Sequence, residues 1–172
     1  MPPSPLKEPV FVALKALLQP LGFRKAGGVF SRKLNDVFHL IELQGSRDST
    51  ATKAKYTVNI AVFLPDLIYE DVREFTKPSV SASHWRERLG FLAPENQDTW
   101  WHATTAAEAE RNAQDICVKL RQYALPAFEQ LSTSAAVVSF WSSGSSPGIT
   151  EHQRKEYLAR LKTPFHPAQS DA

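Results

Sequence analysis

The segment from Lys55 to Leu64 constrains the fold of this chain more than any other. Apolar and polar side chains alternate along it: one side carries Tyr56, Val58, Ile60, Val62 and Leu64, and the other carries Lys55, Thr57 and Asn59. A repeat of two residues is the period of a β-strand whose one face is buried. The segment therefore predicts a strand in a sheet that packs one face against a hydrophobic core.

Two further segments upstream predict strands that pair with it. They cover residues 29–34 and 37–44, are separated by Asn35 and Asp36, and are followed by a polar loop over 45–54. Short polar connections of this kind join antiparallel strands. We expect a three-stranded antiparallel meander. In its middle strand Val37, Ile41 and Leu43 face the core, and Glu42 and Gln44 lie on the opposite face.

The sequence predicts helices both before and after the strands. Residues 10–21 have the apolar spacing of an amphipathic helix. Thr105 and Glu108 have the spacing of a capping box, and a long helix is expected from there to Leu131, with a kink or break near Tyr123 because Pro126 interrupts it. A short helix is expected after Thr150, where Gln153 completes a second capping box.

The remaining patterns complete the fold class. Residues 85–89 and 99–102 predict two more strands, and residues 135–141 fit either a short buried helix or a strand. The chain is expected to be an α+β protein. Its antiparallel sheet of about five strands follows an N-terminal amphipathic helix and precedes a long helix and a short C-terminal helix. We expect one domain over residues 6–162, with disordered tails at 1–5 and 163–172.

Composition places the chain among globular proteins. It is 42% hydrophobic and 22% charged, and its single cysteine, Cys117, allows no internal disulfide. No leader pattern is seen at the start, and no apolar run approaches the roughly 20 residues that span a bilayer. We therefore expect a cytoplasmic protein without a membrane partner. A formal charge of +2 is too small to indicate a polyanionic partner, and we do not expect nucleic acid to be one.

The densest group of candidate binding residues lies between positions 84 and 102. It comprises His84, Trp85, Arg86, Arg88, Trp100 and Trp101. Tryptophan and arginine are enriched at binding hot spots, which favours a recognition surface. Tryptophans on a hairpin also commonly cover the end of a core, with arginine stems packed beside them. Both interpretations stay open.

Other candidate sites are weaker. Glu42, Gln44 and Asn59 form a patch on one sheet face, which either binds a ligand or is an ordinary solvated face. Six basic residues could converge near the first strands and bind an anion: Arg24, Lys25, Arg32, Lys33, Lys53 and Lys55. No metal or cofactor is expected, because the sequence contains no compact set of ligands and no phosphate-binding loop. Cys117 lies in the apolar stripe of the long helix, where a cysteine is normally inert.

Five segments of the chain resemble a known family. They are LLQPLGFRK (17–25), FHLIELQGS (38–46), YTVNIAV (56–62), HWRERLG (84–90) and DTWW (98–101). In this order they resemble the bacterial family catalogued as domain of unknown function four-three-zero-four. The resemblance implies a bacterial source and a small α+β fold. It implies no activity and no catalytic residues.

Two functional hypotheses follow. The first is a non-enzymatic protein-interaction module, of the kind found among toxin-neutralising or defence-associated proteins. The charge of +2 argues against the toxin-neutralising form, because a protein that blocks a basic nuclease is expected to be acidic.

The second hypothesis is a pocket for a small anionic or nucleotide-like ligand, in a binding protein or an enzyme. In it Arg86 and Arg88 are charge clamps, Trp100 or Trp101 stacks on the ligand, and Glu42 or His84 handles a proton. This hypothesis requires those side chains to converge in space.

Overall fold

The fold is a curved antiparallel sheet with helices packed against it, as the predicted α+β class requires. The structure is a computed structural model that describes residues 5–68, 77–144 and 147–162. The strands are β1 (Arg24–Ala26), β2 (Val29–Leu34), β3 (Val37–Gly45), β4 (Ala54–Phe63), β5 (Trp85–Arg88) and β6 (Trp101–Ala103). The order is β1-β2-β3-β4-β5, and β6 also pairs with β4.

The predicted meander is confirmed as β2, β3 and β4. The middle pair runs in register from Phe38 opposite Phe63 to Gly45 opposite Tyr56. β5 and β6 do not pair with each other as a hairpin would. β5 pairs with the Asn59 to Val62 part of β4, and β6 pairs with its beginning. The two short strands thus continue one another along a single edge of the long strand. The three-residue strand β1 was not predicted.

Most helices lie before or after the strands in sequence. Before them come η1 (Pro5–Lys7), α1 (Glu8–Leu18) and η2 (Gln19–Leu21). Two short helices, η3 (Pro65–Leu67) and α3 (Leu89–Leu92), lie in connections between strands. After them come α4 (Ala106–Lys119), the π-helical turn η4 (Leu120–Ala124), α5 (Leu125–Gln130), α6 (Ser134–Ser142) and α7 (Glu151–Lys162). The segment at 135–141, which fitted helix or strand, is therefore a helix.

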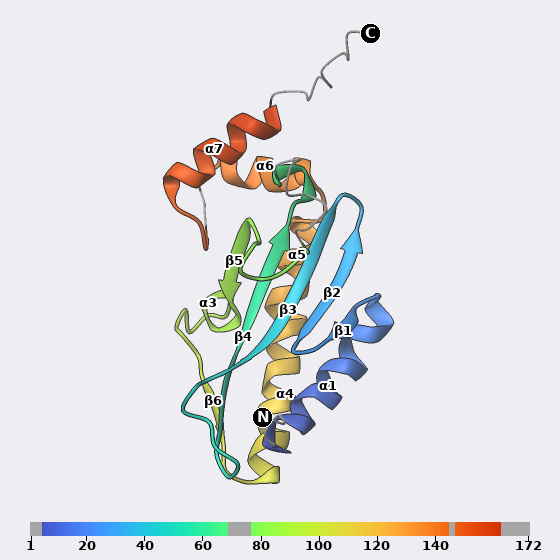
Figure 1. Ribbon diagram of the computed structural model, residues 1–172, viewed down its shortest axis with the longest axis vertical. Coiled ribbons are helices and arrows are strands. Elements are labelled where there is room, and N and C mark those ends of the chain that lie inside the picture. Colours follow the sequence, from blue (N-terminus) through green and yellow to red (C-terminus); the bar gives the residue numbers. More distant parts are fainter. Residues whose placement is uncertain (1–4, 69–76, 145–146, 163–172) are drawn as a thin grey trace.

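The long helix is interrupted where the sequence predicts. Thr105 and Glu108 form the expected capping box, with the Thr105 hydroxyl accepting the Glu108 amide at 3.2 Å. Pro126 has no amide hydrogen to continue the α-helical pattern. The chain accommodates it by widening into the π turn at 120–124, directly before α5. This is one of the known causes of helix distortion, and the helix direction is kept (Figure 1).

The helices cover one face of the sheet. α1 and α4 pack against each other on the core side of the sheet, where α4 passes behind β3 and β4 (Figure 1), and α6 and α7 lie at one end. Val10, Leu14 and Leu18 of α1 are fully buried against the inward-facing side chains of β3 and β4. Leu21, expected on the same helical face, is 40% exposed, because α1 ends at Leu18 and the chain turns into η2.

The opposite face of the sheet has a smaller apolar cluster at one end. Leu40, Ala61 and Phe63 are buried there, and Ile68, Val80 and Ala82 pack against them. The predicted outward position of Glu42 and Gln44 on this face is confirmed, since both alternate with buried Ile41 and Leu43. α1 and α4 thus lie together on one side of the sheet, and the polar half of the other side carries the candidate site.

Two sequence expectations concern the ends and the membrane. The tails at 1–4 and 163–172 lie outside the described residues, and Pro5 begins η1. None of the helices within the described residues combines the length and the apolar character that crossing a bilayer needs.

Candidate functional site

A row of side chains crosses the side of the sheet opposite α1 and α4, which we call the open face. Val29, Glu42, Asn59 and Arg88 lie directly opposite one another on β2, β3, β4 and β5. Gln44 lies two residues further along β3 on the same face. Because residues paired across antiparallel strands point to the same side, the sheet itself brings the predicted site residues Glu42, Asn59 and Arg88 together.

Asn59 organises the acidic half of this row. Its side-chain amide donates to Oε2 of Glu42 at 2.8 Å and to Oε1 of Gln44 at 2.7 Å. Both amide hydrogens are thereby used, and the two acceptors on β3 are held in fixed positions. The expected polar patch therefore exists as a connected set of hydrogen bonds.

Arg88, Asp98 and Trp100 form the other half. The Asp98 carboxylate pairs with the Arg88 guanidinium and accepts the Trp100 indole N–H at 3.2 Å. The guanidinium carbon of Arg88 and the ammonium nitrogen of Lys55 each lie 5.2 Å from the centre of the Trp100 ring. Trp100 is partly exposed. A partly exposed indole with two cations over it is a preorganised aromatic and cationic contact surface.

Arg86 is used to hold the fold. Its guanidinium donates to the carbonyl oxygen of Gly148 at 2.8 and 3.3 Å and to that of Ser81 at 3.2 Å. These bonds tie the segment before α7 to strand β5.

A shallow cavity of about 310 Å³ lies beside β5. It is lined by Asn59, Val80, Arg86, Glu87, Arg88 and Phe91. Burial raises the pKa of the Glu87 carboxyl, which lines this cavity.

The structure places three of the predicted site residues in the core. His84, Trp85 and Trp101 are 3%, 2% and 6% exposed. The Trp101 indole donates to Asp115 at 2.8 Å, and Nδ1 of His84 accepts the amide of Leu64 at 3.0 Å. Burial lowers the pKa of His84 to about 4, with smaller contributions in the same direction from nearby arginines. The group on the open face is therefore built without these three side chains. We call the remaining set the open-face group; its members are Glu42, Gln44, Lys55, Asn59, Arg88, Asp98 and Trp100.

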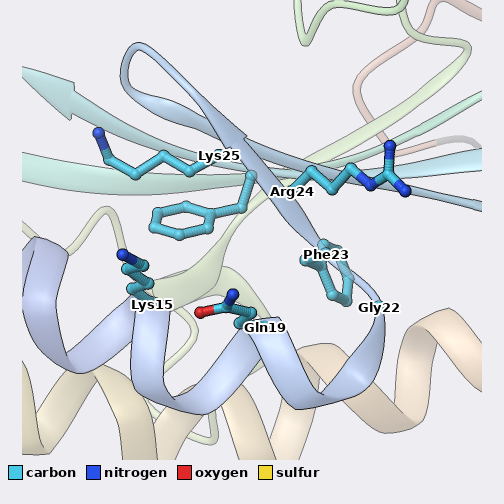
Figure 2. A pocket seen from close by; sticks show the side chains of 7 residues that line it. Lys15, Gln19, Gly22, Phe23, Arg24 and Lys25 are labelled. Carbon is cyan, nitrogen blue, oxygen red and sulfur yellow. The ribbon is translucent and has the colours of Figure 1, made fainter.

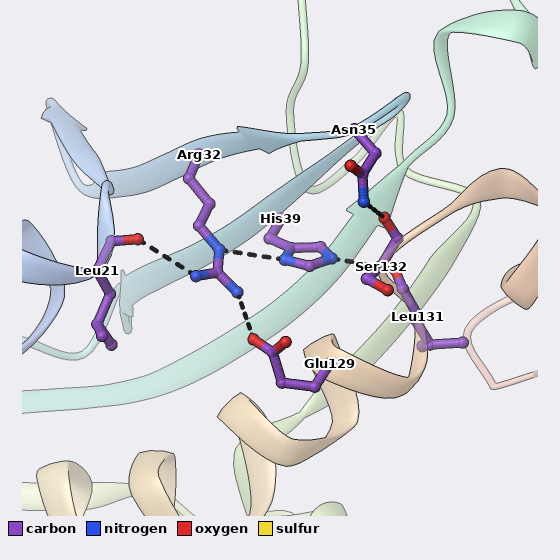
Figure 3. A network of polar contacts seen from close by, with 7 residues as sticks. All are labelled: Leu21, Arg32, Asn35, His39, Glu129, Leu131 and Ser132. Atoms are coloured by element: carbon purple, nitrogen blue, oxygen red, sulfur yellow. Dashed lines mark hydrogen bonds and ion pairs between the residues drawn. The ribbon is translucent and has the colours of Figure 1, made fainter.

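A buried histidine network was missed by the sequence analysis (Figure 3). Nε2 of His39 donates to the carbonyl oxygen of Leu131 at 3.0 Å, and Nδ1 accepts Nε–H of Arg32 at 3.3 Å. The imidazole stacks on Phe128 with 4.3 Å between ring centres and 5° between planes. Arg32 also donates to the Leu21 carbonyl and pairs with Glu129 at 3.0 Å.

His39 is therefore a neutral structural residue. Burial is the main cause that lowers its pKa to about 4, and the charge of Arg32 acts in the same direction. With both ring nitrogens bonded, the imidazole is not placed to abstract a proton from a ligand. The signal was present in the sequence: His39 alternates with Val37 and Ile41 and so falls on the buried side of its strand.

The six basic residues do not converge on one site. Lys55 lies over Trp100, Arg32 joins the His39 network, and Lys33 lies 5.9 Å from the centre of the Phe38 ring. Lys53 is exposed in the loop before β4. Arg24 and Lys25 lie on β1 beside a second cavity, between that strand and α1. Their dispersion gives no single basic surface of the kind expected for a nucleic-acid partner.

The structure also bears on cysteine reactivity and on metal binding. Cys117 is buried on α4, and burial raises the pKa of its thiol, as expected for an inert core cysteine. Across residues 5–68, 77–144 and 147–162, no three His, Cys, Asp or Glu side chains gather as metal ligands would.

Comparison with known proteins identifies a family. The family description that matches the chain is "Domain of unknown function (DUF4304)", and the match covers residues 14–130. Neither the comparison with curated proteins nor the comparison with solved structures gave a match. The matched residues run from α1 to the end of α5 and contain every strand of the sheet and the whole open-face group. The chain therefore belongs to the family of the domain of unknown function DUF4304.

Proposed function

We propose that this protein is a non-enzymatic interaction module whose open face binds an acidic surface of another protein. The observation that carries the proposal is the partly exposed Trp100, held by Asp98 and covered by Arg88 and Lys55. Tryptophan and arginine supply most of the binding free energy at many protein interfaces. Here both are ordered before any partner arrives, which reduces the entropy cost of association.

Charge supports an acidic partner. The open face carries four cations, Lys33, Lys55, Arg86 and Arg88, and the carboxylate of Glu42, which keeps its negative charge while it accepts a hydrogen bond from Asn59. Asp98 neutralises Arg88 in part, and Lys55 approaches Asp48 only to 3.9 Å. The balance of the face is therefore positive, which favours association with a negatively charged surface. A basic toxin such as a nuclease would be repelled, so we do not propose the toxin-neutralising form.

The carboxylates at the site support a binding role over a catalytic one. Glu42 is fixed by Asn59, and Asp98 is fixed by Arg88 and Trp100. A general base needs a free lone pair directed at a substrate. In both carboxylates the oxygens that accept these bonds are directed at groups of the protein itself.

A second candidate function is supported by the 310 Å³ cavity beside β5. Its volume is at the lower end of the range for small-molecule sites, and Arg86 and Arg88 line it. A small anion there would have to compete with Gly148 and Ser81 for Arg86, and with Asp98 for Arg88. We rank this candidate second for that reason.

The proposal is tested by affinity capture with variants of matched charge. Tagged wild-type protein, Arg88→Glu and Trp100→Ala are incubated with nuclease-treated native cell extract, and retained proteins are identified by mass spectrometry. The control is Arg121→Glu, which makes the same charge change on an exposed residue of the long helix, behind the sheet. Captured proteins are then purified and their affinity is remeasured directly.

The proposal expects an acidic partner that binds wild type and Arg121→Glu with equal affinity. Loss of one hot-spot contact reduces affinity by at least about tenfold, so Arg88→Glu and Trp100→Ala should each show that loss. A partner that is lost equally from Arg88→Glu and Arg121→Glu would contradict the proposal. Retention of a small anion by wild type, without a protein partner, would favour the second candidate.

A further inference from the structure

The chain covers the two edges of its sheet in different ways. β1 forms one edge; it is three residues long, and its exposed Arg24 and Lys25 lie beside a cavity of about 600 Å³ (Figure 2). A short edge strand with charged side chains is poorly suited to pairing with another strand. β5 forms the other edge, and there a distant part of the chain covers the strand.

This cover consists of residues 147–150, directly before α7, which we call the strap (Figure 1). The backbone N–H of Arg86 donates to the carbonyl oxygen of Pro147 at 3.4 Å, and the Arg86 guanidinium donates to that of Gly148 at 2.8 and 3.3 Å. The two backbones touch, since a Cβ added to Gly148 would lie 2.3 Å from the Arg86 carbonyl oxygen. The strap therefore lies where a further strand would pair with β5.

The next outward amide of β5 is covered locally. The backbone N–H of Arg88 donates to Oε1 of Glu87 at 3.0 Å. Arg86 and Arg88 alternate along the strand, so their amides are directed to the same edge. Each amide thus bonds to a group that is not a neighbouring strand. An edge of this kind binds extended peptides in other proteins once its N–H and C=O groups are accessible.

The strap is held by few contacts. Its backbone bond to Arg86 is long, and Pro147 has no N–H with which to return one. In α7, which follows the strap, every residue of 151–161 is at least partly exposed. The family match over residues 14–130 includes β5 but not the strap. The part of the chain that the family describes therefore contains this edge without its cover.

We infer that the strap is a displaceable cover of β5, and that an extended acidic segment of the partner protein replaces it as an added strand. Arg86 and Arg88 lie opposite Ala61 and Asn59 and so point to the open face. In an added strand, two alternate side chains would lie beside these arginines. A carboxylate binds a guanidinium more strongly than the neutral Gly148 carbonyl does. The inference rests on the proposed function, because it describes how the acidic partner binds.

Competition between the strap and the partner gives a specific expectation. A variant that loosens the strap should bind the partner segment more tightly, because the closed strap reduces the fraction of protein that is competent to bind. Gly148→Ala does this, since its methyl group would overlap the Arg86 carbonyl oxygen. Gly144→Ala is the matched control. Both glycines have positive φ, +74° and +96°, but a Cβ at 144 meets no atom within 4 Å.

The test is a titration of isotope-labelled full-length protein with the blocked peptide Thr-Asp-Thr-Asp-Thr, followed by backbone amide chemical shifts. Threonine favours the extended conformation, and the alternate aspartates face one side of a strand. Two control peptides are titrated in parallel. One has asparagine in place of each aspartate, and the other has methylated backbone amides, which cannot donate to a strand. The amide spectrum of each variant shows whether it is folded.

In the wild type the peptide is expected to shift the amides of Arg86, Arg88 and Gly148 together. Gly148→Ala should bind it about fivefold more tightly or better, which corresponds to the loss of one competing hydrogen bond, and Gly144→Ala should bind as the wild type does. The asparagine peptide should bind about tenfold more weakly, and the methylated peptide should not bind.

Equal affinities of Gly148→Ala and Gly144→Ala would overturn the inference, as would equal binding of the methylated peptide. If Gly148→Ala does not fold, the wild type decides: a peptide that shifts Arg86 and leaves Gly148 unchanged does not displace the strap. Unshifted β5 amides at millimolar peptide would also overturn it. The capture experiment with Trp100→Ala does not require strand addition, so a failure of this inference is distinguishable from a failure of the proposed function.

Discussion

Lowering the pH should destabilise this protein through two buried histidines, and replacing His39 should remove about half of the effect. His39 and His84 are 0% and 3% exposed, and the pKa of each is lowered from 6.5 to about 4. Below pH 6.5 the unfolded chain binds protons that the folded chain does not bind. The contribution of the two neutral histidines to the free energy of unfolding is therefore complete above pH 6.5 and decreases as the pH drops toward 4.

The magnitude follows from the size of the pKa difference. Between about pH 7 and pH 5, each histidine should lower the free energy of unfolding by about 2 kcal/mol, so the pair should lower it by about 4 kcal/mol. Below pH 5 the protonation of carboxylates adds to the loss. The measurement is therefore confined to the range in which the histidines dominate.

The assay is urea denaturation followed by tryptophan fluorescence at several pH values in this range. His39→Gln keeps a donor for the Leu131 carbonyl but does not titrate, and it should lose only about 2 kcal/mol between pH 7 and pH 5. Its stability at pH 7 is not the test, because a repacked side chain also changes that value. His102→Gln, which removes an exposed imidazole from β6, is the matched control. Identical pH profiles for wild type and His39→Gln would refute the reasoning.

Two further predictions concern local structure. Thr105→Ala removes the hydroxyl that accepts the Glu108 amide and should lower the free energy of unfolding by about 1 kcal/mol in urea denaturation, and no change would mean that the capping box is dispensable. Gly148→Ala should destabilise the protein more than Gly144→Ala, measured in the same way. Both glycines have positive φ, so each change costs about 1–2 kcal/mol in backbone strain, but a Cβ at 148 would also lie 2.3 Å from the Arg86 carbonyl oxygen, whereas a Cβ at 144 meets no atom within 4 Å. Equal losses in the free energy of unfolding for the two variants would show that the backbone at Arg86 moves aside without a measurable energy cost.

The regular parts of the fold could be predicted because they repeat a pattern. The alternation along β4 and the polar turn at Asn35 and Asp36 identified the meander with little ambiguity, and two capping boxes located the starts of α4 and α7. The path of the edge strands could not be predicted. β5 and β6 are three or four residues long, and their pairing with β4 depends on the loop through α3, which no local pattern specifies.

The candidate site was predictable to the extent that one sheet face determines it. Glu42, Gln44 and Asn59 share a face because of the strand period, and the structure connects them by hydrogen bonds. The strand period did not show which of the neighbouring tryptophans is exposed. Trp100 and Trp101 are adjacent, so one points outward and the other inward, and which one is exposed depends on where β6 starts.

The buried polar groups show the same limit. His39 could be placed on the core side of its strand, but its partners Arg32 and Leu131 come from β2 and the end of α5. Long-range hydrogen bonds of this kind depend on how the helix docks on the sheet, and no spacing along the chain encodes that. Arg86 is a similar case: its residue type suits a binding site, but its partner Gly148 is 62 residues away.

Photocrosslinking in living cells tests most directly whether the open face is the surface that contacts a partner protein. A photoreactive phenylalanine analogue is placed at Gln44 or Phe91 near the open-face group, or at Val12 or Val118, which are 58% and 45% exposed on α1 and α4 behind the sheet. We expect ultraviolet light to link the first two positions to an acidic protein and to leave the last two unlinked. Crosslinks from Val12 and Val118 but not from Gln44 and Phe91 would place the interface on the helices and contradict the proposal.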